Sequence, residues 1–307
     1  MKNLVISSGG INILCLLGSL KYLNEKNLLN DTKCFFGISA GAILCTMLAL
    51  DYTINEMNEF FINFNLIKFV GEYDITNFIN NYGFSFGESR DIIGQSIIIY
   101  KLGEQNKDYT FKQLYDDTKK ELNMFAVCLE DKTLWEFSHK SNENVPIWKA
   151  MAASCNIPFI FTPININNNT FIDGALINPF PINYVNENEI NDTIGLFMNS
   201  KNNKVNYLDH IPNLKYYLET YFLYISRDSS KCKCKCYNFY KNTIEICLPD
   251  KYKDYTYKFD ISNEDKYILI DIGYDITKNK YNNIINNKNI INNKNKTKIK
   301  KSNSCFF

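Results

Sequence analysis

Residues 35–44 read FFGISAGAIL, so that Ser39 lies between Gly37 and Gly41. The chain has only 13 glycines in 307 residues, and two of them flank this serine. Apolar runs on both sides predict a buried strand, a sharp turn and a helix, the setting in which a G-x-S-x-G motif presents a nucleophile. Only small residues fit so tight a turn, and Gly37, Ala40 and Gly41 meet this requirement. The stretch therefore predicts either a structural turn or a nucleophile elbow at Ser39.

The segments on either side of the turn alternate between strand and helix patterns. Residues 2–7 and 33–36 are short apolar runs typical of buried strands, whereas the apolar residues of 12–26 recur at helical spacing. A second helix is expected at residues 40–50. This order predicts parallel strands joined by helical crossovers, and hence an α/β fold.

The remainder of the chain predicts further elements of the same kinds. Residues 51–122 are expected to be mostly helical. Strands are predicted at residues 124–129, 134–137, 170–173 and 193–199, and helices at 147–154, at 208–226 and after an N-cap at Ser262. From residue 283 the chain consists mainly of Asn, Lys and Ile without a period, which indicates a disordered tail over residues 283–307.

The composition argues against several classes of protein. Hydrophobic residues make up 45% of the chain, enough for a sizeable core. The 34 basic and 33 acidic residues give no excess of positive charge for binding nucleic acid. No run approaches the roughly 18 apolar residues that cross a bilayer, and Gly9-Gly10 interrupts the apolar N-terminal region with no cleavage site after it. We expect a protein that is neither secreted nor membrane-spanning, and that is cytoplasmic or peripheral to membranes.

The C-terminal third has a cluster of cysteines and a run of lysines, residue types that bind metals and membrane surfaces. Three cysteines alternate with lysine over residues 232–236, but no second ligand pair has the spacing of a zinc site. We therefore expect a solvated loop there, with no bound metal and no cofactor. The lysines at 294, 296, 298, 300 and 301 resemble a polybasic membrane-binding tail, although a solvated Lys/Asn tail is the simpler interpretation.

A serine hydroxyl is a weak nucleophile and needs a base to accept its proton. The chain has two histidines, His139 and His210. His210 follows Asp173, which matches the Ser…Asp…His order of α/β-hydrolase triads. However, His210 begins a predicted amphipathic helix rich in Lys and Tyr, and His139 lies in a polar loop. A histidine base is therefore the less favoured alternative.

Asp173 is the other candidate base. It ends a predicted strand in FIDGALINPFPI, residues 171–182, and Gly174-Ala175 follows it. If the strands are parallel, its carboxylate emerges at the same edge of the sheet as Ser39, where functional sites gather. An Asp-Gly turn without a chemical role is the alternative.

Three separated parts of the chain together resemble the patatin-like phospholipase family. They are SSGGINILCLLGSL (residues 7–20), GISAG (37–41), and the pair AASCNIPFIFTPI (152–164) and FIDGALINPFPI (171–182). The resemblance covers about residues 2–190, and the spacing of 134 residues from Ser39 to Asp173 (173 minus 39) fits it. It implies a three-layer α/β/α fold with a mostly parallel central sheet. Residues 1–190 would form the catalytic core, and residues 191–282 would complete the same domain.

The resemblance also implies roles for individual residues. Ser39 would be the nucleophile that forms an acyl-enzyme, and Asp173 would accept its proton without any histidine. Because an aspartate of ordinary pKa near 3.9 is a weak base, most of the catalysis would come from positioning and from stabilising the oxyanion. Backbone N–H groups would form the oxyanion hole at Gly9, Gly10, Ile11 and Ala40.

The function that the resemblance implies is that of a calcium-independent lipid acyl hydrolase, similar to phospholipase A. Its substrate would be phospholipid or another glycerolipid, and the protein would associate transiently with a membrane surface. The first motif departs from the family pattern, since Ser8 and Ile13 replace glycines and Asn12 replaces a basic residue. A non-catalytic lipid-binding or scaffold protein of the same fold therefore remains an alternative, as does acyl transfer to an alcohol other than water.

Overall fold

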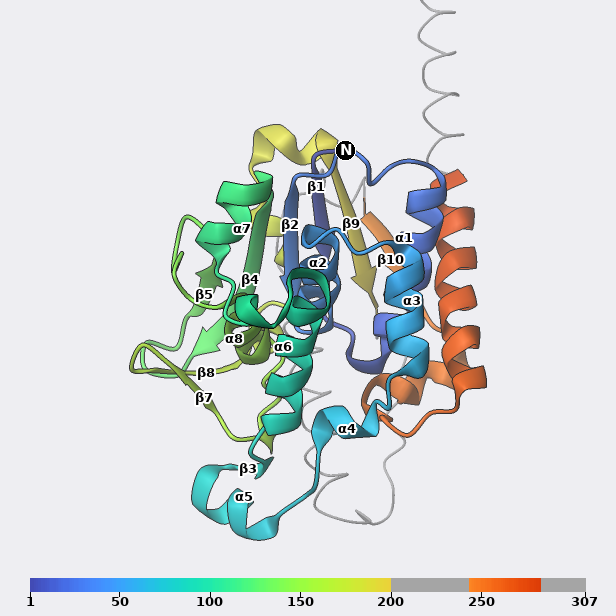
Figure 1. Ribbon diagram of the computed structural model, residues 1–307. Helices are drawn as coiled ribbons and strands as arrows, with labels where there is room; N and C mark the ends of the chain where they lie inside the picture. Colours follow the sequence, from blue (N-terminus) through green and yellow to red (C-terminus); the bar gives the residue numbers. More distant parts are fainter. Residues whose placement is uncertain (200–242, 283–307) are drawn as a thin grey trace, which may run out of the picture.

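The structure, a computed structural model, describes residues 1–199 and 243–282 (Figure 1). The strands of its large sheet are β1 (Asn3–Ile6), β2 (Cys34–Ile38), β4 (Glu121–Cys128), β5 (Leu134–Phe137), β7 (Ile164–Ile166), β8 (Asn169–Asp173), β9 (Thr193–Met198) and β10 (Thr243–Ile246). They lie in the order β10-β9-β1-β2-β4-β8-β7, with β5 also paired to β4. The short strands β3 (Gly83–Ser85) and β6 (Phe159–Phe161) pair with each other in a second sheet.

The centre of the large sheet is parallel and one side is antiparallel. The strands β10, β9, β1, β2 and β4 all run in the same direction. Beyond them, β5 and β8 run antiparallel to β4, and β7 runs antiparallel to β8. The predicted α/β fold with a mostly parallel central sheet is confirmed.

Helices surround this sheet (Figure 1). They are α1 (Ile13–Glu25), α2 (Ala40–Ala49), α3 (Ile54–Asn63), α4 (Ile67–Val70), α5 (Ile75–Asn81), α6 (Glu88–Leu102), α7 (Phe111–Thr118), α8 (Ile147–Ser154) and a last described helix at residues 263–282. Short 3-10 helices include η1 (Gly10–Asn12), η3 (Gly174–Leu176), η4 (Pro181–Tyr184) and η5 (Glu187–Asp192).

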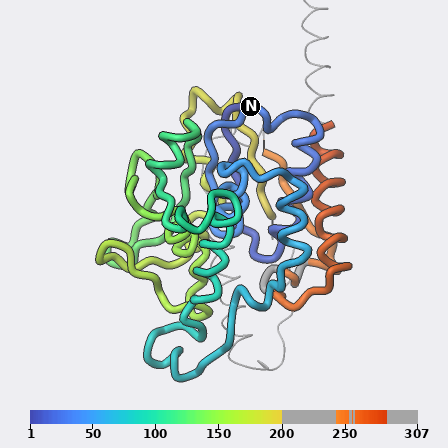
Figure 2. Tube along the Cα trace, viewed as in Figure 1, coloured from blue at the N-terminus to red at the C-terminus, as the bar shows by residue number. Residues whose placement is uncertain are grey.

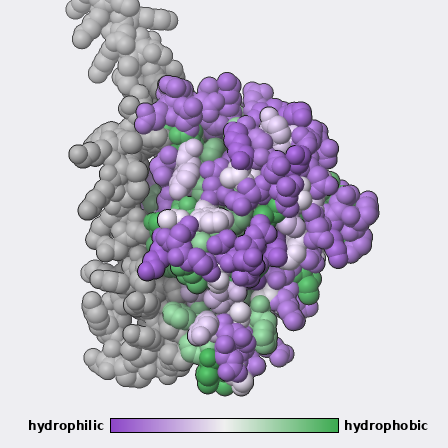
Figure 3. Space-filling view, turned by 90° about the vertical axis from the view of Figure 1, so that its left-hand side faces the viewer, coloured by the Kyte–Doolittle hydropathy of each residue, from purple (hydrophilic) through white to green (hydrophobic). Residues whose placement is uncertain are grey.

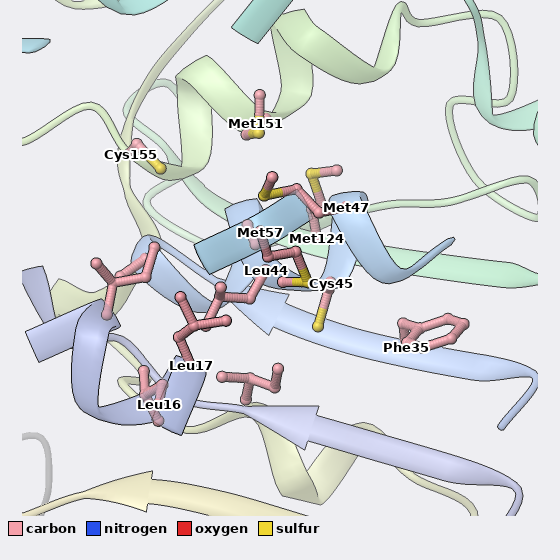
Figure 4. Close-up of a cluster of buried hydrophobic side chains, with 14 of the residues drawn as sticks. Leu16, Leu17, Phe35, Leu44, Cys45, Met47, Met57, Met124, Met151 and Cys155 are labelled. Atoms are coloured by element: carbon pink, nitrogen blue, oxygen red, sulfur yellow. The ribbon is translucent and has the colours of Figure 1, made fainter. Parts of the chain in front are cut away.

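The main hydrophobic core lies between the helices and one face of the sheet. Figure 4 shows part of it, where side chains of α1, α2 and α3 meet those of β2 and β4. A smaller cluster on Val5 of β1 includes Ile182 and Val185, which belong to η4 and the residue after it. The burial of apolar surface on the sheet holds the strand ends that carry the candidate site.

Most of the predicted elements are confirmed within the described residues. Each strand predicted there is present, although β4 begins three residues earlier than expected, at Glu121. The N-cap at Ser262 is confirmed, because its hydroxyl accepts a hydrogen bond of 3.0 Å from the Asp265 N–H. The short strands β3, β6, β7 and β10 were not predicted. The helix at 208–226, His210, the cysteines of 232–236 and the tail at 283–307 lie outside the described residues.

The helix at 263–282 packs against α1 at a very close backbone contact, and Figure 2 shows the two traces next to each other. A Cβ atom on Gly18 would lie 1.8 Å from the Ile270 carbonyl oxygen, and one on Gly273 would lie 1.9 Å from the Cys15 oxygen. Ser19 Oγ donates a hydrogen bond of 3.3 Å to the Gly273 carbonyl at this crossing. Glycine is required here because the two helix backbones touch.

A lobe made of α5, β3 and the loops around them projects from the lower end of the molecule (Figure 1). It carries the exposed apolar side chains of Ile75, Ile79, Tyr82 and Phe86. Figure 3 shows a largely hydrophilic side face, with hydrophobic residues gathered toward this lower end. Within residues 1–199 and 243–282, no helix has the length and apolar character that a bilayer crossing requires.

We expect Gly273→Ala to destabilise the protein. Alanine favours a helix by about 1 kcal/mol over glycine, but overpacking against the backbone of α1 costs typically 1–3 kcal/mol or more. Urea unfolding should therefore show a lower free energy of unfolding. The matched control is Gly94→Ala in α6, where the nearest atom to a new Cβ is the flexible Met151 Cε at 3.0 Å. An equal loss of the free energy of unfolding in both variants would contradict the close backbone contact between α1 and the helix at 263–282.

Candidate active site

Ser39 occupies a strained turn between β2 and α2. It follows Ile38, the last residue of β2, and is the N-cap residue of α2, with φ 53° and ψ −124°. A positive φ in a residue other than glycine costs on the order of 1–3 kcal/mol, and such strain persists only where the surroundings fix it. This is the backbone geometry of a nucleophile elbow, in which the serine side chain stands out from the turn.

The two glycines that flank Ser39 are required by close backbone contacts. A Cβ on Gly37 would lie 2.5 Å from the Gly41 carbonyl oxygen, and one on Gly41 would lie 2.3 Å from the oxygen of Ile6. The second contact brings the start of α2 against the end of β1. The structure thus gives a steric reason for each glycine of GISAG.

The structure brings Ser39 and Asp173 into direct contact. Ser39 Oγ donates a hydrogen bond of 2.6 Å to Asp173 Oδ2. The other carboxylate oxygen, Oδ1, accepts a bond of 2.8 Å from the Ala175 N–H, which fixes the orientation of the carboxyl group. The two residues are only 7% and 5% exposed. A hydroxyl and a carboxylate at this distance form the pair that a serine nucleophile and its base require.

The path by which Asp173 reaches Ser39 differs from the expected one. The sequence suggested parallel strands whose carboxyl ends meet at one edge, but β8 runs antiparallel to β4. Asp173 ends β8 opposite Ala126 of β4, one residue beyond the pairing of Ile38 with Phe125. A Cβ on Gly174 would lie 2.6 Å from the Phe125 carbonyl oxygen, so the chain turns tightly against β4 there. The two residues therefore meet across β4 from opposite strand directions.

Burial changes the acid–base character of Asp173. Desolvation raises the pKa of its carboxyl group to about 7, although the hydrogen bonds from Ser39 and from the Ala175 N–H favour the charged form. The expectation of an ordinary, weakly basic aspartate was wrong, because the sequence alone does not give its burial. A base with a pKa near the working pH suits proton transfer better than a normal aspartate.

Ser154, the last residue of α8, binds the backbone of the turn at Ser39. Its hydroxyl accepts a hydrogen bond of 2.9 Å from the Ser39 N–H and donates one of 2.7 Å to the Phe125 carbonyl. It thereby ties α8 and β4 to the strained residue. Sequence reasoning did not single out Ser154, although it belongs to AASCNIPFIFTPI, one of the segments that carried the family resemblance.

Asn156 and Arg90 hold the Asp173 side of the pair. The Asn156 carbonyl accepts a hydrogen bond of 2.9 Å from the Asp173 N–H, and its Nδ2 donates one of 2.9 Å to the Phe171 carbonyl. The buried Arg90 of α6 donates to Asn156 Oδ1 and forms an ion pair of 2.8 Å with Asp91. Neither residue was predicted: Arg90 lies on α6, far from β8 in the sequence, and Asn156 carries no signal of its own within AASCNIPFIFTPI.

A narrow apolar pocket of about 60 Å³ lies beside Ser39. Gly10 and Ile11 of the first glycine-rich turn line it together with Ser39 and Ala40. Gly10 has φ 53°, in the left-handed region that favours glycine. Gly9 precedes it as the N-cap residue of η1. The structure thus brings the first motif and the elbow to one cavity.

His139 lies away from this pair. It follows β5, near Glu121 at the start of β4, whereas Ser39 lies at the level of Ala126 near the end of that strand. Its ring stacks on Tyr115 at 3.9 Å between centroids, and burial lowers its pKa. Its position supports a packing role.

The sequence of the chain is similar to a protein family and to several viral proteins. A family model described as patatin-like phospholipase matches residues 4–186. A probable lipid hydrolase of Invertebrate iridescent virus 6 is 33% identical over 186 residues, which are 59% of this chain and 62% of that protein. An uncharacterized protein of Acanthamoeba polyphaga mimivirus is 25% identical over 292 residues, or 92% of this chain and 86% of that protein. The chain therefore spans less than two thirds of the viral lipid hydrolase.

Two crystal structures share the fold. VipD from Legionella pneumophila matches with a TM-score of 0.53 at 15% identity, over 91% of this chain and 66% of VipD. The type III effector ExoU of Pseudomonas aeruginosa matches with a TM-score of 0.52 at 14% identity, over 92% of this chain and 53% of ExoU. At this identity the likeness concerns the fold alone.

The buried carboxyl group of Asp173 makes a prediction about stability and pH. Its pKa is about 7 in the folded protein and about 3.9 in an unfolded chain. Between these values the folded state binds more protons, so the free energy of unfolding falls as the pH rises from about 4 to about 7. Asp173→Asn does not ionise. We compare the free energy of unfolding of Asp173→Asn with that of wild type by urea unfolding. The difference, variant minus wild type, should be about 2–3 kcal/mol more favourable to the variant at pH 8 than at pH 5.

The control for that experiment is Asp31→Asn, which changes an exposed carboxylate. Its effect on the free energy of unfolding should be nearly the same at both pH values. A gain for Asp173→Asn that does not depend on pH would contradict the raised pKa.

Ser154→Ala should slow the reaction of Ser39 with a fluorophosphonate. The substitution leaves the Ser39 N–H buried without its partner, and a displacement near 1 Å costs on the order of 100-fold in rate. We expect the labelling rate to fall by about 10-fold to 100-fold. The rate is measured by mass spectrometry of the labelled chain over time. Ser19→Ala is the control, because it removes another fully buried hydroxyl that donates to two carbonyl groups. It should lower stability and leave the labelling rate unchanged; equal rates in all three proteins would contradict the role of Ser154.

Proposed function

This chain belongs to the patatin-like phospholipase family, and we therefore propose that it is a lipid acyl hydrolase of the phospholipase A type. The observation that carries the proposal is the hydrogen bond of 2.6 Å from Ser39 Oγ to Asp173 Oδ2, beside an apolar pocket that Ser39 lines. The name of the iridescent virus relative, a probable lipid hydrolase, supports the same class of reaction.

The proposed reaction proceeds through an acyl-enzyme. Asp173 accepts the hydroxyl proton as Ser39 Oγ attacks the ester carbonyl carbon, and the proton then passes to the departing alcohol. In the second half, Asp173 takes a proton from water as the oxygen of the water attacks the acyl-enzyme carbonyl carbon. The bond to Ser39 Oγ then breaks, the fatty acid leaves, and the proton passes from Asp173 back to Ser39 Oγ. The pKa of about 7 leaves much of Asp173 ionised at neutral pH and ready to accept a proton.

The oxyanion of each tetrahedral intermediate needs backbone donors. The N–H groups of Ser8 and Asn12 are bonded to the carbonyls of Pro179 and Gly9, and that of Ser39 is bonded to Ser154. We assign the oxyanion hole to the N–H groups around Gly10, with Ile11 and Ala40, because these residues line the pocket beside Ser39. In this scheme the departures of the first motif from the family pattern leave the backbone donors in place.

Two features support a lipid rather than a water-soluble ester as substrate. The pocket beside Ser39 is lined almost entirely by apolar side chains, which suits an acyl chain. The lobe of α5 and β3 exposes Ile75, Ile79, Tyr82 and Phe86, and exposed apolar clusters of this kind mark contact with partners or membranes. We propose transient contact with a membrane surface there.

The proposal predicts the behaviour of four proteins in an assay of fatty acid release from phospholipid vesicles. Ser39→Ala and Asp173→Asn should fall to the uncatalysed background, because one loses the nucleophile and the other the base. Replacing His139 and His210 together with Gln should leave fatty acid release within about tenfold of wild type, a barrier change of about 1.4 kcal/mol. Equal release by wild type and Ser39→Ala would overturn the proposed mechanism. A collapse to background when both histidines are replaced would favour a histidine base.

Fluorophosphonate labelling separates the hydrolase from a protein that only binds lipid. A hydrolase labels at Ser39 in the wild type and fails to label in Ser39→Ala. Absence of labelling in folded wild-type protein would point to a scaffold that retains the fold.

A further inference from the structure

The pocket beside Ser39 has a wall of phenylalanine rings that come from separate parts of the chain. Phe60 and Phe64 lie at the end of α3 and just after it, and Phe69 lies on α4. Phe259 precedes the helix at 263–282 and lies beyond the residues that the family model matches. This part of the pocket is therefore built by a segment outside the family-matched region.

The rings are ordered by contacts with one another. Phe60 and Phe64 stack with 5.5 Å between centroids and 3° between planes. Phe69 and Phe259 stack at 6.2 Å and 19°. Offset stacking of this kind adds about 0.5–1.5 kcal/mol per pair beyond burial. We call these four residues the phenylalanine wall.

The wall separates the pocket from a larger groove on the surface. Phe60, Phe64 and Ile93 line both cavities. The pocket has a volume of about 60 Å³, whereas the groove has about 570 Å³. A protein cavity of about 150 Å³ is known to hold benzene, so the pocket as it stands holds only a few carbon atoms. A longer chain must displace the rings to reach the groove.

Lys266 fixes the wall from the helix at 263–282. Its ammonium group donates hydrogen bonds of 2.8 Å to the Ile62 carbonyl and 2.7 Å to the Phe64 carbonyl. The residue is only 4% exposed. Carbonyl groups at the end of a helix lack partners within the helix, and a lysine at that end satisfies them. Lys266 thereby holds the backbone that carries Phe60 and Phe64.

We propose that the phenylalanine wall is the end stop of the acyl-chain site and sets the chain length that the enzyme accepts, with Lys266 as a positioning residue. This inference rests on the proposed function, since it concerns the acyl group bound beside Ser39. Short acyl chains fit in front of the rings. Long chains are disfavoured because they have to open the wall toward the groove.

The test compares hydrolysis of p-nitrophenyl butyrate and p-nitrophenyl laurate. Wild type should have the higher kcat/KM for butyrate. In Phe64→Ala the ratio of kcat/KM for laurate to kcat/KM for butyrate should rise by about tenfold or more, because the pocket gains room for several methylene groups. Lys266→Met, which keeps the apolar stem and loses both hydrogen bonds, should raise the ratio by a smaller factor. The matched control is Phe84→Ala, which removes a half-buried ring stacked on Phe78 in the lobe, and its ratio should equal that of wild type.

A binding assay makes the result independent of catalysis. In a Ser39→Ala background, displacement of the fluorescent fatty acid cis-parinaric acid gives the affinities for laurate and butyrate. Adding Phe64→Ala should raise the affinity for laurate relative to butyrate by a factor similar to the change in the kcat/KM ratio. Phe64→Leu serves the same purpose if the alanine variant does not fold, because it keeps an apolar side chain and still removes the ring.

The two proposals fail in different ways. If wild type cleaves both esters and the ratios stay unchanged in the kinetic and the binding assays, the end stop is wrong and the hydrolase stands. If no ester is cleaved and no fluorophosphonate label appears, the hydrolase is wrong. A shifted binding ratio then still supports the wall as the limit of a fatty acid site.

Discussion

The whole candidate site depends on the close approach of the first turn of α2 to the end of β1 and to Gly37 of β2. A Cβ on Gly41 would lie 2.3 Å from the Ile6 carbonyl oxygen, and one on Gly37 would lie 2.5 Å from the Gly41 carbonyl oxygen, so glycine at both positions permits the approach. Between these contacts Ser39 has a positive φ of 53°, and its hydroxyl meets the carboxylate of Asp173. Strain at one residue is maintained because a large buried core holds both strands and the helix in place.

The serine and its carboxylate partner are held by different supports. Ser154 binds the Ser39 N–H from α8, and Asn156 binds the Asp173 N–H two residues later in the chain. The motif that contains both residues therefore orients the two halves of the pair. Burial then raises the pKa of Asp173, at a cost in stability above that pKa.

The segment beyond the family-matched residues contributes to the site as well as to the fold. The helix at 263–282 crosses α1 at Gly18 and Gly273, where the backbones touch. The same helix places Lys266 under the end of α3, and the loop before it places Phe259 against Phe69. One packing contact between two helices thus positions part of the pocket next to Ser39.

The sequence by itself determined the α/β class, the tight turn at Ser39 and the N-cap at Ser262, because local spacing and small residues carry these signals. Asp173 as the partner of Ser39 was predicted from the resemblance of separated motifs to a known family. Only the tertiary structure decided that β8 runs antiparallel, that burial moves the pKa of Asp173 to about 7, and that Ser154, Arg90 and Asn156 support the pair. It also decided which rings close the pocket. Strand direction, desolvation and contacts between distant segments depend on how the whole chain packs, and no local pattern encodes them.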